Sequence, residues 1–125
     1  MRAWALGLVV LASCQVSAAE MRCGWFDNST PGNMSLLDRD GSWNISVQGG
    51  EAVDDDSMAI VSQVTENQDE FVRTNRNNGF SCACLTVDSD IESFTIVKIH
   101  QAKQLLLKQC LEDIHITPRI PLPFK

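Results

Sequence analysis

Two cysteines separated by one residue, Cys82 and Cys84, are the side chains of this sequence best suited to chemistry. Such a pair serves either as a thiol–disulfide redox couple or as two half-cystines that bond elsewhere. In an extended strand both side chains point to one face, with Cα atoms about 6.6 Å apart and parallel Cβ vectors, which disfavours a bond between them. A redox motif usually has two intervening residues at a helix start, so we favour the structural role.

Each of these cysteines needs a partner from elsewhere in the chain, and Cys23 and Cys110 are the natural candidates. Four cysteines in a short chain are typical of a disulfide framework formed in an oxidising compartment. Cys23 bonds one member of the pair and Cys110 bonds the other, and the sequence leaves the two ways of doing so open. Each bridge would close a long loop and stabilise the fold by on the order of 3 to 4 kcal/mol.

The first nineteen residues have the character of a signal peptide. Met1-Arg2 supplies a positive start, residues 3–12 form an apolar run, and Ser17-Ala18-Ala19 supplies the small residues that a signal peptidase reads. We therefore predict a signal peptide at 1–19 and a single small domain at 20–125. No later run approaches the roughly 18 to 20 apolar residues that a spanning helix needs, so we expect a periplasmic or secreted protein.

The same leader supports a second interpretation. Leu11-Ala12-Ser13-Cys14 is similar to the lipobox of bacterial lipoproteins, in which the cysteine becomes the lipidated first residue. On this alternative Cys14 would anchor the domain to a membrane. Both routes leave the same domain outside the cytoplasm.

Charge limits the partners that the chain can bind. The sequence has sixteen acidic and ten basic residues, for a net charge of -6, and it contains the run Asp54-Asp55-Asp56 with nothing basic beside it. Nucleic acids require a basic surface, so we do not expect one as a partner. The aspartate run is typical of a solvated, flexible loop.

Metal and catalytic motifs find little support. Asp38-Arg39-Asp40-Gly41 offers carboxylates, but the further ligands of a calcium loop do not follow at the required spacing, so a turn is favoured. His100 and His115 are not in a metal-binding spacing, and no nucleophile elbow, P-loop or His-Glu-x-x-His motif is present. We therefore predict no metal, no cofactor and no catalytic residue.

Alternating polar and apolar residues predict a mainly β domain, with a small antiparallel meander sheet stapled by two disulfides and a short C-terminal helical or irregular segment. The central strand is 80–87, which carries the cysteine pair between apolar residues on both faces. A hairpin is predicted at 34–47, with Trp43, Ile45 and Val47 on one face and Ser42, Asn44 and Ser46 on the other. Further strands are expected at 23–27, 71–74 and 93–101, the last with a bulge near Ile96.

Three segments have a weaker pattern. Residues 51–70 are assigned to a mobile insertion, in which Met58 to Val61 forms either a short helix capped at Ser57 or an irregular strand. Residues 88–92 are expected to form a polar turn. The run 102–113 is a candidate helix, and the proline-rich tail 118–125 favours an extended conformation.

The aromatic residues Trp25, Phe26 and Trp43 either line a ligand groove or fill the core, and the core is favoured in so small a domain. Three Asn-x-Ser/Thr triplets, at 28–30, 33–35 and 44–46, match the glycan acceptor pattern. They would matter in a eukaryotic secretory pathway and mean little in a bacterial host.

Five motifs follow one another along the chain: Cys23-Gly24-Trp25-Phe26, Asn28-Ser29-Thr30-Pro31-Gly32-Asn33, Ser46-Val47-Gln48-Gly49-Gly50, Cys82-Ala83-Cys84-Leu85 and Ala102-Lys103-Gln104-Leu105. Together they resemble a family of short exported bacterial proteins known only as a domain of unknown function. The resemblance implies a location in the bacterial envelope and an intact set of four cysteines, but no activity, ligand or catalytic residue. Ser81, where glycine is expected, and Leu106, where proline is expected, depart from the pattern.

Together these features predict an exported, non-catalytic binding or envelope accessory domain. Its partner would be an envelope protein or a small ligand, and it would meet a membrane only if lipidated at Cys14. The alternatives are a lipid-anchored envelope lipoprotein and a thiol–disulfide redox protein.

Overall fold

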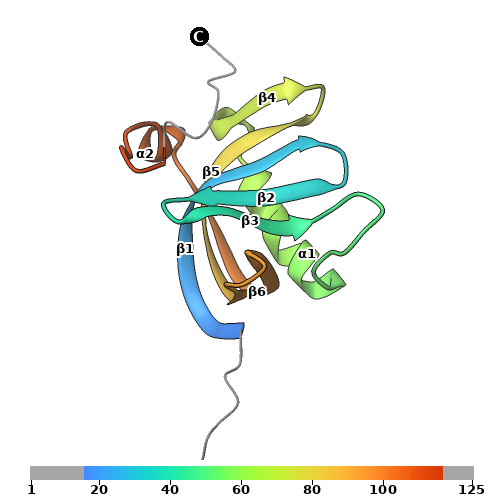
Figure 1. The fold of residues 1–125 in the computed structure, drawn as a ribbon. Coiled ribbons are helices and arrows are strands. Elements are labelled where there is room, and N and C mark those ends of the chain that lie inside the picture. The colour runs from blue at the N-terminus through green and yellow to red at the C-terminus, as the bar shows by residue number, and fades with distance from the viewer. Residues whose placement is uncertain (1–15, 117–125) are drawn as a thin grey trace, which may run out of the picture.

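The computed structural model describes residues 16–116 and places one six-stranded sheet at the centre of the molecule (Figure 1). The mainly β class with a short helix near the C-terminus is confirmed. The elements in chain order are β1 (Val16–Thr30), β2 (Asn33–Asp38), β3 (Gly41–Ser46), α1 (Asp55–Val61), η1 (Ser62–Thr65), η2 (Gln68–Glu70), β4 (Phe71–Asn75), β5 (Asn78–Asp90), β6 (Thr95–Leu105) and α2 (Leu107–Leu111).

The sheet closes into a barrel. Its strand order is β1-β2-β3-β6-β5-β4, and β1 also pairs with β5, so five strands form a ring with β4 attached to β5. The first three strands are the expected meander. The ring is completed by a short parallel contact between β3 and β6, where Asn44 pairs with Thr95 and its N–H donates to the Phe94 carbonyl at 2.8 Å. The result is a partly open five-stranded barrel, an architecture also found in OB-folds.

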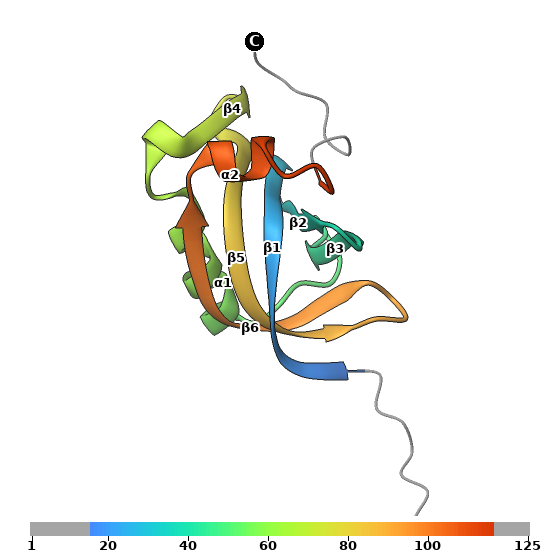
Figure 2. The ribbon, with the colours of Figure 1, turned by 90° about the vertical axis from the view of Figure 1, so that its left-hand side faces the viewer.

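Strand β5 is central, as predicted, and Figure 2 shows it between β1 and β6. It is longer than expected, because residues 88–90 continue the strand instead of forming a turn. Pairing on both sides satisfies their backbone groups, and Ser89 is buried with its hydroxyl donating to the Glu20 carboxylate at 2.6 Å.

Strand β6 contains two bulges. Val97 and His100 are each an extra residue against β5, because the pairing shifts between Asp88 and Ser89 and between Thr86 and Val87. The bulge expected near Ile96 is confirmed. Its effect is to bring Ile96 and Ile99 into the same core while Val97 is exposed, although strict strand alternation would place Ile99 on the face of Val97.

The prediction of a mobile insertion at residues 51–70 is wrong. This segment forms α1, η1 and η2, and it packs Val61 and Val64 into the core at 1% and 0% exposure. The helix cap is Asp54, whose carboxylate accepts from the Ser57 N–H at 2.8 Å, and not Ser57 itself. The aspartate run is therefore a helix start, where acidic side chains are favoured, and not a flexible loop.

Two apolar clusters lie on opposite faces of the sheet. The larger fills the barrel and includes Phe26 and Trp43, and the smaller lies beneath α2 and includes Trp25, the neighbour of Phe26 in β1. All three aromatic side chains are at most 1% exposed, so they form core and do not line a ligand groove. Val47 was expected on the buried hairpin face but is 44% exposed, because β3 ends at Ser46.

The structure describes only residues 16–19 of the predicted signal peptide. Cys14 and the tail 118–125 lie outside the described residues, and the cleavage site after Ala19 stays a prediction. Val16 and Ser17 form the start of β1 and pair with Asp90 and Ser89 of β5. Within residues 16–116, no helix has the length and apolar character required to cross a membrane.

Candidate functional site

The four cysteines form two disulfides, Cys23 with Cys84 and Cys82 with Cys110, which is one of the two pairings that the sequence left open. Cys23 bonds Cys84, its direct partner across β1 and β5, with Cα atoms 4.0 Å apart. Cys82 bonds Cys110 of α2, with Cα atoms 5.8 Å apart. Both sulfurs of the strand lie on one face, and Ala83 packs into the barrel on the other. The register of β1 against β5 decides the pairing that the sequence left open.

The two disulfides differ in accessibility. Cys82 and Cys110 are each 1% exposed and belong to the cluster beneath α2, whereas Cys23 is exposed and Cys84 half-buried. The buried bridge attaches a helix of only five residues to the sheet. The arrangement suits cross-links that hold the barrel and α2 together.

The aspartates at 38 and 40 serve a turn and not a calcium site. Asp38 is buried, and its Oδ1 accepts from the Trp43 indole N–H at 3.0 Å and from the backbone N–H groups of Asp40 and Gly41. Its Oδ2 accepts from the Arg22 guanidinium at 2.9 Å. Both carboxylate oxygens are thus occupied by protein donors.

The histidines lie in separate places. His100 Nε2 is 3.0 Å from Asp88 Oδ1, and the Ala19 N–H and this histidine hold the pKa of Asp88 below its usual range. His115 is exposed in the turn after α2. Across residues 16–116, no group of three or more His, Cys, Asp or Glu side chains is arranged to hold a metal ion.

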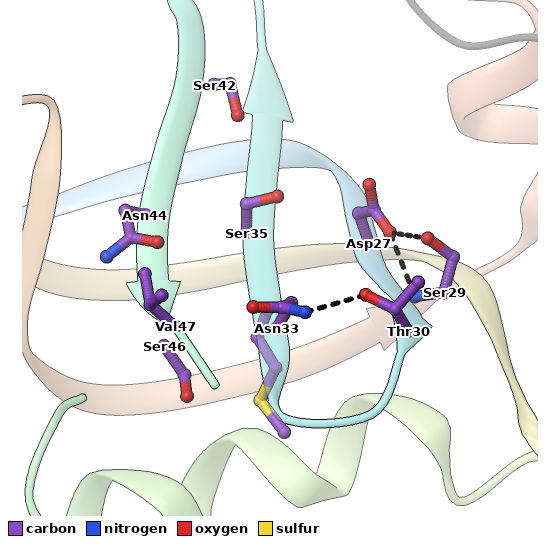
Figure 3. Close-up of a pocket in the computed structure, with 10 residues that line it drawn as sticks. Asp27, Ser29, Thr30, Asn33, Ser35, Ser42, Asn44, Ser46 and Val47 are labelled. Atoms are coloured by element: carbon purple, nitrogen blue, oxygen red, sulfur yellow. Dashed lines mark hydrogen bonds between the residues drawn. The ribbon is translucent and has the colours of Figure 1, made fainter. Parts of the chain in front are cut away.

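A polar groove crosses β1, β2 and β3 on the outer face of the barrel (Figure 3). The strand alternation that buries Trp43 and Ile45 turns the hydroxyl and amide side chains of the hairpin outward into this groove. The groove is lined by Asp27, Ser29, Thr30, Asn33, Met34, Ser35, Ser42, Asn44, Ser46 and Val47.

Some of these side chains build the end of the groove. Asn33 Nδ2 donates to Thr30 Oγ1 at 2.9 Å, as Figure 3 shows, and its Oδ1 accepts from the Gln48 N–H at 2.9 Å. The Ser46 hydroxyl donates to the Gly32 carbonyl at 2.8 Å. These bonds tie the β1–β2 turn to the end of β3, so the groove has a fixed shape before any ligand arrives.

Other side chains of the groove have no protein partner. Within the described part of the chain, Ser35, Ser42 and Asn44 make no side-chain hydrogen bond. Asp27 Oδ1 accepts from the N–H and hydroxyl of Ser29 at 2.9 and 2.6 Å, while its Oδ2 has no donor there. The groove therefore presents unused donors and acceptors to solvent.

Three of these residues form a row across the strands. Asp27 is the register partner of Ser35, and Ser35 is the register partner of Asn44. Neighbouring strands are about 4.8 Å apart, so the row spans roughly 10 Å. Asp27 is the only ionisable lining residue, and no lysine or arginine lines the groove.

A scan against protein-family models matches residues 17–117 to the family described as "Protein of unknown function (DUF4087)". The chain belongs to the DUF4087 family. No curated protein and no solved structure matches it. The resemblance noted from the sequence is thus confirmed at the level of the family, while the individual motifs stay predictions.

In this DUF4087 domain the groove was only partly predictable. The hairpin alternation correctly placed Ser42, Asn44 and Ser46 on one face, but no binding role was predicted for them. Asp27 and Ser35, which reach the groove from β1 and β2, were not among the predicted site residues. The usable signal was the set of Asn-x-Ser/Thr triplets, which place amide and hydroxyl side chains along the strands that meet here.

Proposed function

We propose that this DUF4087 protein is an exported, non-catalytic binding domain that holds its ligand in the groove across β1, β2 and β3. The observation that carries the proposal is the set of Ser35, Ser42 and Asn44, whose side chains face solvent on a rigid sheet with no protein partner in the described chain. Polar groups held in place by a scaffold and left unused are suited to recognition.

The scaffold supports the same proposal. The two disulfides are consistent with an oxidising compartment outside the cytoplasm, and they hold β1 and α2 against β5. A preformed site loses little conformational entropy on binding. Such a domain can bind a ligand in the groove without a conformational change.

The test is an NMR titration of the full chain expressed with its leader and purified with its disulfides formed. Soluble bacterial envelope extract, separated by size, is added to the ¹⁵N-labelled protein. We expect saturable shifts at the amides of Ser35, Ser42 and Asn44, and none on β4. Shifts confined to β4 and α2, or no saturable shifts at all, would rule out this groove as the binding site.

A pair of matched variants sharpens the test. Ser35→Ala with Asn44→Ala removes two unused polar groups without touching the core, and we expect it to weaken binding. Thr74→Ala with Gln101→Ala removes two exposed polar groups outside the groove, and we expect no change. Equal behaviour of the two variants would contradict the assignment.

The leader leaves a second candidate, a lipid-anchored envelope lipoprotein. It rests on Leu11-Ala12-Ser13-Cys14, and Cys14→Ser is the direct test. Release of the variant from the membrane fraction would establish the anchor, and unchanged fractionation would eliminate it. Either result is compatible with the groove as a binding surface. The redox alternative is tested separately by insulin reduction, which we expect to be negative.

A further inference from the structure

We infer that the ligand of the groove is an uncharged, hydroxyl-rich chain, an oligosaccharide. The inference rests on the proposed function and specifies its ligand class. It follows from the charge of the groove, the pairing of its strands, the chemistry of its unused groups and its continuation across the barrel.

Charge excludes anionic ligands. The lining has one carboxylate, Asp27, and no basic side chain, and a neighbouring hollow adds Glu51, also without a basic residue. A phosphate or sulfate chain would meet repulsion with no compensating cation.

Strand pairing disfavours a peptide. An extended peptide binds a sheet by pairing with an unpaired strand edge, but β2 is hydrogen-bonded to β1 on one side and to β3 on the other. Peptide side chains also require apolar pockets. The apolar side chains lining the groove are only Met34 and Val47, among eight polar ones. Over β1 to β3 a peptide would therefore find neither an unpaired strand edge nor apolar pockets, although the neighbouring hollow beyond β3 does contain apolar side chains, among them Val53 and Val97.

The groove side chains without a protein partner are suited to hydrogen bonding with sugar hydroxyl groups. A sugar hydroxyl donates one hydrogen bond and accepts two, so it is best satisfied by a mixture of donors and acceptors. Asp27 Oδ2 is an acceptor only, the hydroxyls of Ser35 and Ser42 do both, and the amide of Asn44 supplies two donors and an acceptor. The row from Asp27 to Asn44 thus offers alternating partners to a hydroxyl-bearing chain lying across the strands.

The groove continues beyond β3, which favours a chain over a single small molecule. Asn44 also lines a second hollow, over the seam between β3 and β6, which includes Thr95 and Val97. Asn44 lines both hollows, so an extended ligand that passes over this residue would contact β1, β2, β3 and β6. No aromatic side chain lines either hollow, so we expect hydrogen bonds from the groove, together with aliphatic contacts such as Val53 and Val97 in the second hollow, to hold the chain.

The experiment titrates the ¹⁵N-labelled full-chain protein with neutral tetrasaccharides: cellotetraose, maltotetraose and chitotetraose. A heparin tetrasaccharide, spermidine and tetra-alanine are the comparison ligands. We expect at least one neutral sugar to shift the amides of Ser35, Ser42, Asn44 and Thr95 saturably. We expect Ser35→Ala with Asn44→Ala to weaken that binding about tenfold and Thr74→Ala with Gln101→Ala to leave it unchanged.

The outcomes separate this inference from the proposed function. Saturable shifts at the groove with heparin, spermidine or tetra-alanine but with no neutral sugar would overturn the sugar assignment and leave the groove as a binding site. The same holds if envelope extract shifts the groove while every neutral sugar fails. If no ligand and no extract fraction shifts the groove, both the inference and the proposed function fail.

Discussion

The guanidinium carbon of Arg22 lies 3.7 Å from the centroid of the Trp43 indole ring. Phe94 also stacks on this indole, with centroids 4.3 Å apart, and the indole N–H donates to the buried Asp38. The same guanidinium donates to Asp38, so a cation, an anion and an aromatic ring share one contact network. This network ties β1 to the β2–β3 hairpin.

Replacing Arg22 is expected to destabilise the fold. Arg22→Met keeps much of the packing over Trp43 but leaves Asp38 buried without its cation, since the two side chains are 13% and 4% exposed. Removing one partner of a buried pair costs about 3 kcal/mol. Urea unfolding followed by Trp fluorescence measures the loss. Arg73→Met is the control, because exposed Arg73 donates a hydrogen bond to the uncharged side chain of Gln68 and to no carboxylate of the described residues. Equal stability of the two variants would contradict the role of the network.

Removing the buried disulfide is expected to lower stability strongly. Cys82→Ala with Cys110→Ala opens a loop with a sequence separation of 28 and frees α2 from the sheet. The loop-entropy model gives about 3 to 4 kcal/mol, which corresponds to a fall in Tm of roughly 10 to 20 °C. Calorimetry measures it. A Tm equal to that of the unmodified protein would show that α2 is held by packing alone.

The two disulfides are expected to be reduced in a fixed order. Thiolate attack requires access to sulfur, and Cys23 is exposed whereas Cys82 and Cys110 are each 1% exposed. Under increasing dithiothreitol, alkylation followed by peptide mass spectrometry is expected to label Cys23 and Cys84 first. Labelling of Cys82 and Cys110 at the same or lower reductant concentration would refute this order.

Asp54 is expected to make stability depend on acid pH. A hydrogen bond from Lys98, followed by that from the Ser57 N–H, lowers the pKa of Asp54 from 3.8 to about 2. A carboxylate with a lowered folded pKa stabilises the fold above its unfolded pKa, and that contribution is lost as the pH falls through about 2. Asp54→Asn keeps the cap but loses the charge, so its urea midpoint should lie below wild type at pH 7 and converge with it towards pH 2.

Two controls accompany the Asp54 experiment. Asp55→Asn removes an exposed charge from the first turn of α1 without touching Lys98, and we expect a smaller effect. Added salt should shrink the difference between wild type and Asp54→Asn, because the ion pair with Lys98 is exposed. A difference that is constant from pH 7 to pH 2 would show that the carboxylate charge is not its origin.

Local patterns predicted the local structure well. The alternation of the β2–β3 hairpin correctly put Trp43 and Ile45 inside and Ser42 and Asn44 outside, because one face of each strand must be buried. The cysteines of β5 share a face for the same reason. These features depend on residues a few positions apart.

Features that depend on distant residues were not predictable. The pairing of Cys23 with Cys84 requires the register of β1 against β5, across a sequence separation of 61. The ring requires Asn44 of β3 to meet Thr95 of β6. Each of these contacts is set by the packing of the whole barrel and leaves no periodic signal in the chain.

The prediction for the segment after Asp54 was wrong for a different reason. Its acidic residues suggested a solvated loop, yet they lie at the start of a helix whose far end buries Val61 and, through η1, Val64. The helix is short, so its apolar stripe has few repeats to reveal it. The groove was missed similarly, because Asp27, Ser35 and Asn44 are contributed by three strands.

The pairing of β1 with β5 has a consequence for the newly made chain. During synthesis β1 emerges from the ribosome long before β5. The edge of β1 that pairs with β5 therefore has no hydrogen-bonding partner until most of the polypeptide has been translated. An unpaired edge invites pairing with other chains. We therefore expect nascent chains of this protein to depend on holding chaperones until the ribosome has released β5.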